Sequence, residues 1–182
     1  MSNLSKRFII LFTIFLILAS CVKTIQPLKL EAAIQTAHKY LVEGDFQKAI
    51  EIYNSASAKN LNNKELYNSY LKAIEYIKEN ADRAFNSEIF ASAGYTYYIL
   101  LINYPHFTNF VHLLPFDQYF LDNRIKTCSK NLAAKGLIAY REGKFEEAIY
   151  IWKDILRFDP ENEEIKKSID TATTQLKNFQ KK

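Results

Sequence analysis

Apolar side chains recur every three or four positions through most of the chain, which is the period of an α-helix. Two stripes are the clearest. The first comprises Phe46, Ala49, Ile50, Tyr53 and Ala56, and the second comprises Phe145, Ala148, Ile149, Trp152, Ile155 and Leu156. Because each stripe covers one face and polar residues fill the other, we predict amphipathic helices that pack against one another.

Three further segments carry the same pattern and predict helices over residues 64–85, 117–142 and 161–179. Their apolar positions include Leu66, Tyr70, Leu71, Ile74, Ile77, Ala81 and Ala84, then Leu121, Ile125, Cys128, Leu132 and Ala139, and finally Ile165, Ile169, Ala172, Leu176 and Phe179. The last helix has a charged or hydroxylated opposite face, which suits the end of a helical stack. Only four glycines and four prolines occur in 182 residues, which also favours long helices over strands and turns.

The chain contains an internal repeat. The segments YLVEGDFQKAIEIY (residues 40–53) and AYREGKFEEAIYIW (residues 139–152) share a Glu-Gly pair, a following phenylalanine and an Ala-Ile pair. Gly44 and Gly143 are 99 residues apart by their numbering, close to three periods of about 34 residues. Each glycine can adopt the left-handed conformation that ends a helix, so each copy predicts two helices joined by a tight turn.

These copies resemble tetratricopeptide repeats. The matching residues are Gly136, Gly143, Ala148, Trp152 and Pro160 in a last unit over residues 131–160, and Ala37, Tyr40, Gly44, Ala49, Tyr53 and Ala56 in a first unit over residues 30–60. The last unit departs from the pattern at Lys135 and Ala139, and the first lacks the final proline. A degenerate middle unit keeps Ala93, Tyr97, Leu100 and Pro105 but has no glycine in its turn. The resemblance implies an all-α domain over residues 30–182, with about three helical hairpins and a capping helix at the carboxyl end.

The spacing between the units is irregular. Ala49 and Ala93 are 44 residues apart and Ala93 and Ala148 are 55 apart, so extra structure must lie between the repeats. Part of it is a linker over residues 103–118 with apolar side chains at Phe107, Phe110, Val111, Leu113 and Leu114. Such a segment either packs over the open end of a helix pair or exposes an apolar patch to a partner.

The amino-terminal end has the three parts of an export signal. Lys6 and Arg7 precede an apolar run over residues 8–19 that is too short to span a bilayer, and the small residues Ala19 and Ser20 stand at its end. A buried core helix is the alternative, but it leaves the basic flank and the small residues unexplained. We therefore expect residues 1–20 to be a signal peptide.

Leu18-Ala19-Ser20-Cys21 resembles the lipobox of bacterial lipoproteins. The resemblance implies a diacylglycerol thioether on Cys21, cleavage before it and an acyl chain on its freed amine, with residues 21–29 as a tether. A disulfide is the weaker interpretation because Cys128 is the one other cysteine. Val22 in place of an aspartate implies sorting to the outer membrane with the domain facing the periplasm, or the outer face of the cell membrane in a single-membraned bacterium.

Charge and motifs exclude several classes of function. Of 24 Lys and Arg, two fall within residues 1–20, which leaves 22 basic against 20 acidic residues and a net charge of +2 in the mature chain. This small surplus argues against nucleic-acid binding. His38, His106 and His112 are not spaced as metal ligands on a helix, and the chain has neither a phosphate-binding glycine loop nor a nucleophile elbow. We expect no catalytic residues, no metal and no cofactor apart from the lipid on Cys21, and therefore no enzyme.

The function that remains is binding. The groove-facing positions that the repeat resemblance implies are Ile34, His38, Leu41, Lys78, Asp82, Lys130, Leu137, Tyr140 and Arg141. We expect a protein-protein adaptor in an envelope assembly of the secretion, pilus or outer-membrane biogenesis type. The alternative is a periplasmic carrier of a small apolar or lipidic ligand between helices, motivated by the 13 Phe and 12 Tyr residues. An enclosed apolar pocket would favour the carrier, and an open polar groove the adaptor.

Overall fold

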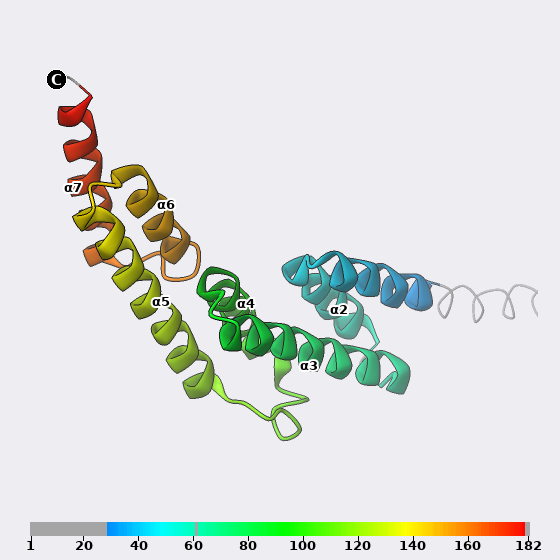
Figure 1. Ribbon diagram of the computed structural model, residues 1–182. Helices are drawn as coiled ribbons and strands as arrows, with labels where there is room; N and C mark the ends of the chain where they lie inside the picture. The colour runs from blue at the N-terminus through cyan, green and yellow to red at the C-terminus, as the bar shows by residue number, and fades with distance from the viewer. Residues whose placement is uncertain (1–28, 61, 181–182) are drawn as a thin grey trace, which may run out of the picture. The chain divides into compact units, whose positions relative to one another are not determined.

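The computed structural model describes residues 29–60 and 62–180, and these residues form helices, turns and one linker without any strand (Figure 1). A helix over residues 29–43 is followed by α2 (Phe46–Lys59), α3 (Lys64–Asn86), α4 (Phe90–Asn103), the short 3-10 helix η1 (Tyr104–Phe107), α5 (Gln118–Arg141), α6 (Phe145–Leu156) and α7 (Glu163–Phe179). The predicted all-α fold is confirmed, and the three long helices predicted from periodicity agree with α3, α5 and α7 to within two residues. The expected signal peptide, Cys21 and the rest of the tether up to residue 28 lie outside the described residues.

Three helix pairs are closed by the same turn. Gly44 and Gly143 have φ of +79° and +77°, as predicted, and Glu88 occupies the equivalent place with φ of +58°. The residue after each has φ between −82° and −84° and ψ between 63° and 69°, and the next helix then begins at a phenylalanine. In each turn the N–H of that following residue donates to a carbonyl five residues earlier at 2.9 Å. The middle pair therefore keeps the turn although it lacks the glycine.

Replacing Glu88 by glycine is expected to raise the free energy of unfolding by about 1 kcal/mol, because a left-handed conformation costs a residue with a Cβ roughly 1–2 kcal/mol and glycine recovers most of it. Urea unfolding followed by circular dichroism would measure the change. Gly143→Ala is the matched opposite: its Cβ would meet nothing within 4 Å, so a loss of about 1 kcal/mol would report the backbone alone. A Glu88→Gly variant no more stable than wild type would contradict the assignment.

The described helices form two compact units, and the division falls between Tyr70 and Leu71 within α3. The first unit packs the 29–43 helix and α2 with the start of α3. Its buried side chains are Ala37, Leu41, Ala49, Ile50, Tyr53, Ala56, Leu66 and Tyr70. The rings of Tyr53 and Tyr70 stack with centroids 4.9 Å apart, and the Tyr70 hydroxyl donates to Asn54 Oδ1. Burial raises the pKa of Tyr70, so this hydroxyl stays a donor.

The second unit packs its helices in sequence. α4 packs against α5, α5 against α6 and α6 against α7, and α4 also contacts α6 (Figure 1). Two glycines allow the closest approaches: Gly94 lies against the ring of Phe158, and Gly136 lies against the indole of Trp152. Cys128 is buried in this core, as its apolar position predicted.

The aromatic side chains of the apolar linker lie largely out of solvent. Phe107 and Phe110 are buried, and so is Phe116. The ring of Tyr104 contacts those of Phe107 and Phe116, with centroids 6.2 and 6.4 Å apart. Val111 and Leu113 remain 43% and 46% exposed at the tip. The packing interpretation therefore holds for the aromatic side chains, and two aliphatic side chains stay partly in solvent.

Candidate functional site

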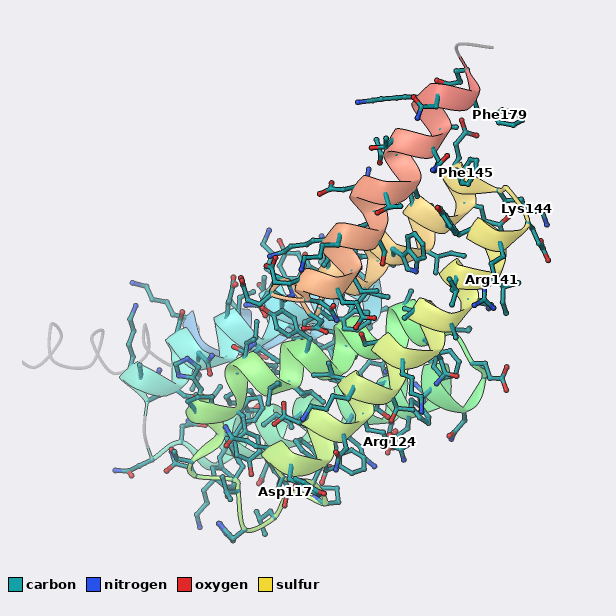
Figure 2. All side chains as sticks on the ribbon, turned by 90° about the vertical axis from the view of Figure 1, so that its left-hand side faces the viewer. Asp117, Arg124, Arg141, Lys144, Phe145 and Phe179 are labelled. Atoms are coloured by element: carbon teal, nitrogen blue, oxygen red, sulfur yellow. The ribbon has the colours of Figure 1, made fainter. Side chains whose placement is uncertain are left out.

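The most distinctive helix of the second unit is α5, because of its charge. Its 24 residues contain five basic side chains and one acidic side chain, Asp122, which gives a net charge of +4. The basic residues are Arg124, Lys126, Lys130, Lys135 and Arg141. All but Arg124 are exposed, and none of the five joins an ion pair found among the described residues. Figure 2 shows Arg124 near the start of the helix and Arg141 at its end. This helix therefore offers cationic groups that the rest of the described chain does not neutralise.

A cleft with a volume of about 510 Å³ lies between α5 and α7. Its lining comprises Lys126, Ser129, Lys130, Ala133, Ala134 and Leu137 of α5, Trp152 of α6, Asp159 and Asn162 of the following turn, and Glu164, Ile165 and Ser168 of α7. The floor is apolar and one side is cationic, whereas the α7 side carries a carboxylate. The cleft is an open groove, with most of its rim exposed to solvent.

Hydrogen bonds fix one end of this cleft. The side chain of Asn162 accepts from the N–H of Ile165 at 3.1 Å and so caps α7. Its amide also donates to Asp159 Oδ2 at 2.7 Å, and Ser129 Oγ donates to the same oxygen at 3.5 Å. Asp159 is thus held by both α5 and the start of α7. These bonds preorganise the position of α7 against α5.

A second cluster joins α3, α4 and α5. Lys78 Nζ pairs with Asp82 Oδ2 at 2.6 Å, and the Tyr97 hydroxyl donates to Asp82 Oδ1 at 2.5 Å. Burial and then the neighbouring Asp82 raise the pKa of Tyr97 above its usual range, so the hydroxyl keeps its proton. The cluster therefore brings Asp82 two donors from two different helices.

Arg124 enters the same cluster from α5. Its guanidinium lies 4.2 Å from the ring centroid of Phe85 and 5.1 Å from that of Phe120, while Lys78 Nζ lies 5.6 Å from the Phe120 centroid. Such cation–π contacts hold a charged group in place without neutralising it. The cluster therefore contains two cations and one carboxylate, of which Lys78 and Asp82 are paired.

The structure brings together some of the residues predicted for the groove. Lys78 and Asp82 are paired in the cluster just described, and Lys130 and Leu137 both line the α5–α7 cleft. Tyr140 packs on Phe145 and Trp152, with centroids 5.4 and 6.0 Å away, and Arg141 is exposed at the end of α5.

The predicted groove residues of the first unit lie in different surroundings. Ile34 is half-buried and His38 is exposed on the 29–43 helix. Leu41 is 6% exposed, so it belongs to the core of its helix pair and not to an open surface.

Sequence reasoning missed several residues of the two sites. Arg124 and Lys126 were not singled out, and neither were Glu164 and Ser168 of α7. The charge of α5 was the available signal, since no other described helix carries more than one net positive charge. The contribution of α7 depends on packing between helices and has no local signature.

The described residues show neither a metal-binding cluster nor a reactive thiol. Residues 29–60 and 62–180 contain no group of three or more His, Cys, Asp or Glu placed to hold a metal ion. Burial raises the pKa of the Cys128 thiol to about 12, which makes it a poor nucleophile at neutral pH. Within the same ranges, no helix has both the length and the apolar character that crossing a bilayer requires.

The chain was compared with protein-family models, with curated protein sequences and with solved structures. None of the three comparisons yields a match. The resemblance to tetratricopeptide repeats therefore rests on the repeated segments themselves, and the function has to be argued from the two sites.

Proposed function

We propose that the chain is a lipid-anchored envelope adaptor whose second unit binds an acidic segment of a partner protein along α5. The observation that carries the proposal is the set of unneutralised cations on that helix beside an open cleft. Arg141, Lys130 and Lys126 are spaced along the exposed length of α5, and Leu137 adds an apolar contact between them. Complementary charge steers such a partner to the surface, and the cleft fixes its register.

The alternative, a carrier of an apolar ligand, has weaker support. A carrier needs an enclosed apolar cavity that buries most of its ligand. The α5–α7 cleft is open and has charged side chains on both rims. Secretion, pilus and outer-membrane biogenesis machines remain the kinds of assembly in which we place the adaptor, at the periplasmic side of the outer membrane.

Charge reversal on α5 tests the adaptor. Lys126→Glu combined with Lys130→Glu is expected to weaken binding of a fluorescent peptide rich in Asp and Glu at least about tenfold, because two favourable charge contacts become repulsive. Anisotropy titration would measure it, and wild-type affinity should fall as salt increases. The matched control is Lys72→Glu with Lys153→Glu, two exposed lysines of α3 and α6 outside the cleft.

The same variants can be compared in pull-downs from detergent-solubilised membranes. Wild type and control should retain a stoichiometric protein partner that the α5 variant loses. Equal retention by all three would refute a role for α5. Co-purified lipid without any protein partner would instead favour the carrier.

A further inference from the structure

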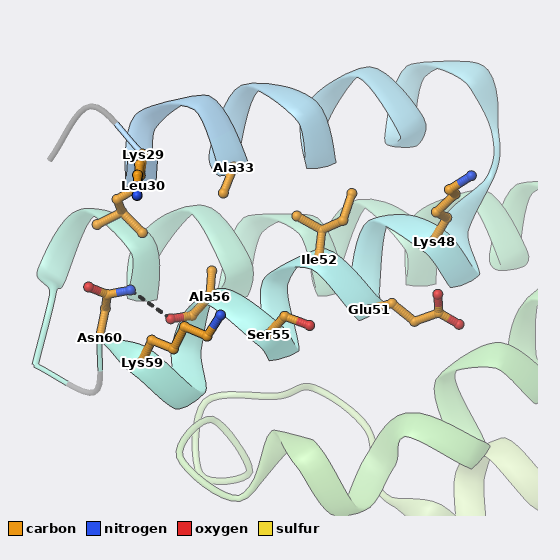
Figure 3. A pocket seen from close by; sticks show the side chains of 10 residues that line it. All are labelled: Lys29, Leu30, Ala33, Lys48, Glu51, Ile52, Ser55, Ala56, Lys59 and Asn60. Carbon is orange, nitrogen blue, oxygen red and sulfur yellow. Dashed lines mark hydrogen bonds between the residues drawn. The ribbon is translucent and has the colours of Figure 1, made fainter. Parts of the chain in front are cut away.

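The first unit has a groove of its own, between the 29–43 helix and α2, with a volume of about 690 Å³ (Figure 3). Leu30 from the first helix and Ile52 and Ala56 from α2 give it an apolar floor. Lysines stand at its rim: Lys29 and Lys59 at one end and Lys48 at the other (Figure 3). The groove thus combines an apolar floor with separated cations.

The three lysines are exposed. None of them joins an ion pair found among the described residues. Lys48 Nζ lies 4.7 Å from the ring centroid of Tyr40, and contact with this tyrosine is the main cause that raises the pKa of Lys48. The one carboxylate at the groove, Glu51, accepts a hydrogen bond from Gln47 Nε2 at 2.8 Å. Three cations against one carboxylate fit an anionic ligand.

The position of the groove in the chain indicates where that ligand comes from. Eight residue steps separate Cys21 from Lys29, and an extended chain covers at most about 29 Å over that length. If Cys21 carries the anchor, as proposed above, Lys29 at the rim cannot leave the neighbourhood of the membrane surface. That reach lets the lysines come within a Debye length of the surface, about 10 Å, where anionic headgroups attract them.

We propose that this groove binds the phosphate-bearing headgroup of an anionic phospholipid in the anchoring membrane. The phosphate pairs with Lys29 and Lys59 at one end of the rim, Lys48 draws a headgroup to the other end, and the adjoining apolar part of the lipid covers Leu30 and Ile52. The inference rests on the proposed anchor for its location and on the charges of the groove for its ligand. It gives the first unit a membrane contact in addition to the acyl chains.

Lysine labelling in vesicles tests the proposal. The processed full chain is reconstituted in phosphatidylcholine vesicles with or without phosphatidylglycerol, and amine acylation is followed by mass spectrometry. Lys29, Lys48 and Lys59 should react about fivefold more slowly with phosphatidylglycerol, the factor that corresponds to the attraction of one lysine to an anionic surface. Lys39, whose side chain is 71% exposed and paired with Glu43, should react at the same rate in both.

A variant links the protection to the groove. Lys48→Gln with Lys59→Gln should abolish the protection of Lys29, whereas Lys39→Gln should leave it intact. Lys29, Lys48 and Lys59 would overturn the proposal if they reacted at equal rates in the two kinds of vesicle, whether those rates are both fast or both slow. The intact mass reports the lipid on Cys21 separately. If acyl chains are missing, the anchor fails, and labelling with added vesicles still decides whether the groove takes the headgroup.

Discussion

Replacing Trp152 by alanine is expected to lower the free energy of unfolding by about 3–5 kcal/mol, because the indole fills the contact between α5 and α6. The side chain is 4% exposed, and its Nε1–H donates to the carbonyl of Ala133 at 3.2 Å. Urea unfolding should be followed by far-ultraviolet circular dichroism. Trp152 is the one tryptophan of the chain, so the variant has no indole fluorescence to follow. Tyr150→Ala is the control on the same helix: its side chain is 70% exposed, so we expect a change within about 0.5 kcal/mol.

A substitution at Gly136 tests whether the indole of Trp152 accounts for the loss of stability. A Cβ at this position would overlap the indole of Trp152, so Gly136→Ala alone should cost roughly 1–3 kcal/mol. In the Trp152→Ala background the ring is gone, and the same change should be neutral or stabilise by up to about 1 kcal/mol, because alanine favours a helix over glycine. An equal loss in both backgrounds would contradict the proposed contact.

The helices could be predicted because their burial is periodic. One face of each segment enters the core, so apolar residues return every three or four positions and mark both the helix and its extent. The bounds of α5 were predicted well for a further reason: Asp117 caps its start by accepting from the N–H of Phe120 at 2.7 Å, and such residues are visible in a sequence.

The middle turn shows where local reasoning ends. Glycine identified two turns because it adopts positive φ without strain. Glu88 adopts the same conformation at a cost in conformational free energy that the surrounding packing offsets. A glutamate at that position does not predict a turn. The structure reveals it only by the repetition of backbone angles and hydrogen bonds in all three hairpins.

The candidate site could be predicted only in part for a similar reason. Lys130 and Leu137 follow from the repeat pattern on one helix, and both line the cleft. Arg124 contacts Phe85, which lies 39 positions earlier in the chain and on the far side of the apolar linker. That contact is set by how α3 and α5 pack, and packing between distant segments has no periodic signal. At Leu41 the resemblance implied a side chain facing an open groove, but the side chain is buried.

Acylation of the chain is expected to depend entirely on Cys21. Each buried methylene of an acyl chain contributes roughly 0.8 kcal/mol, so one chain holds a protein marginally and two or three hold it stably. Cys21→Ala removes every chain at once, since without the thioether the lipoprotein pathway implied by the lipobox cannot cleave the signal or acylate the new amine. The described helices offer no spanning segment in compensation.

Radiolabelled palmitate therefore should enter wild type and leave Cys21→Ala unlabelled. Cys128→Ala is the matched control: its thiol is buried in the second unit and has a pKa raised to about 12, so its loss should leave the label unchanged. Label that persists in Cys21→Ala but disappears in Cys128→Ala would assign the lipid to Cys128 and contradict the proposal. Equal label in all three proteins would place the lipid elsewhere, and the first unit would then lose the tether that keeps Lys29 within about 29 Å of the bilayer.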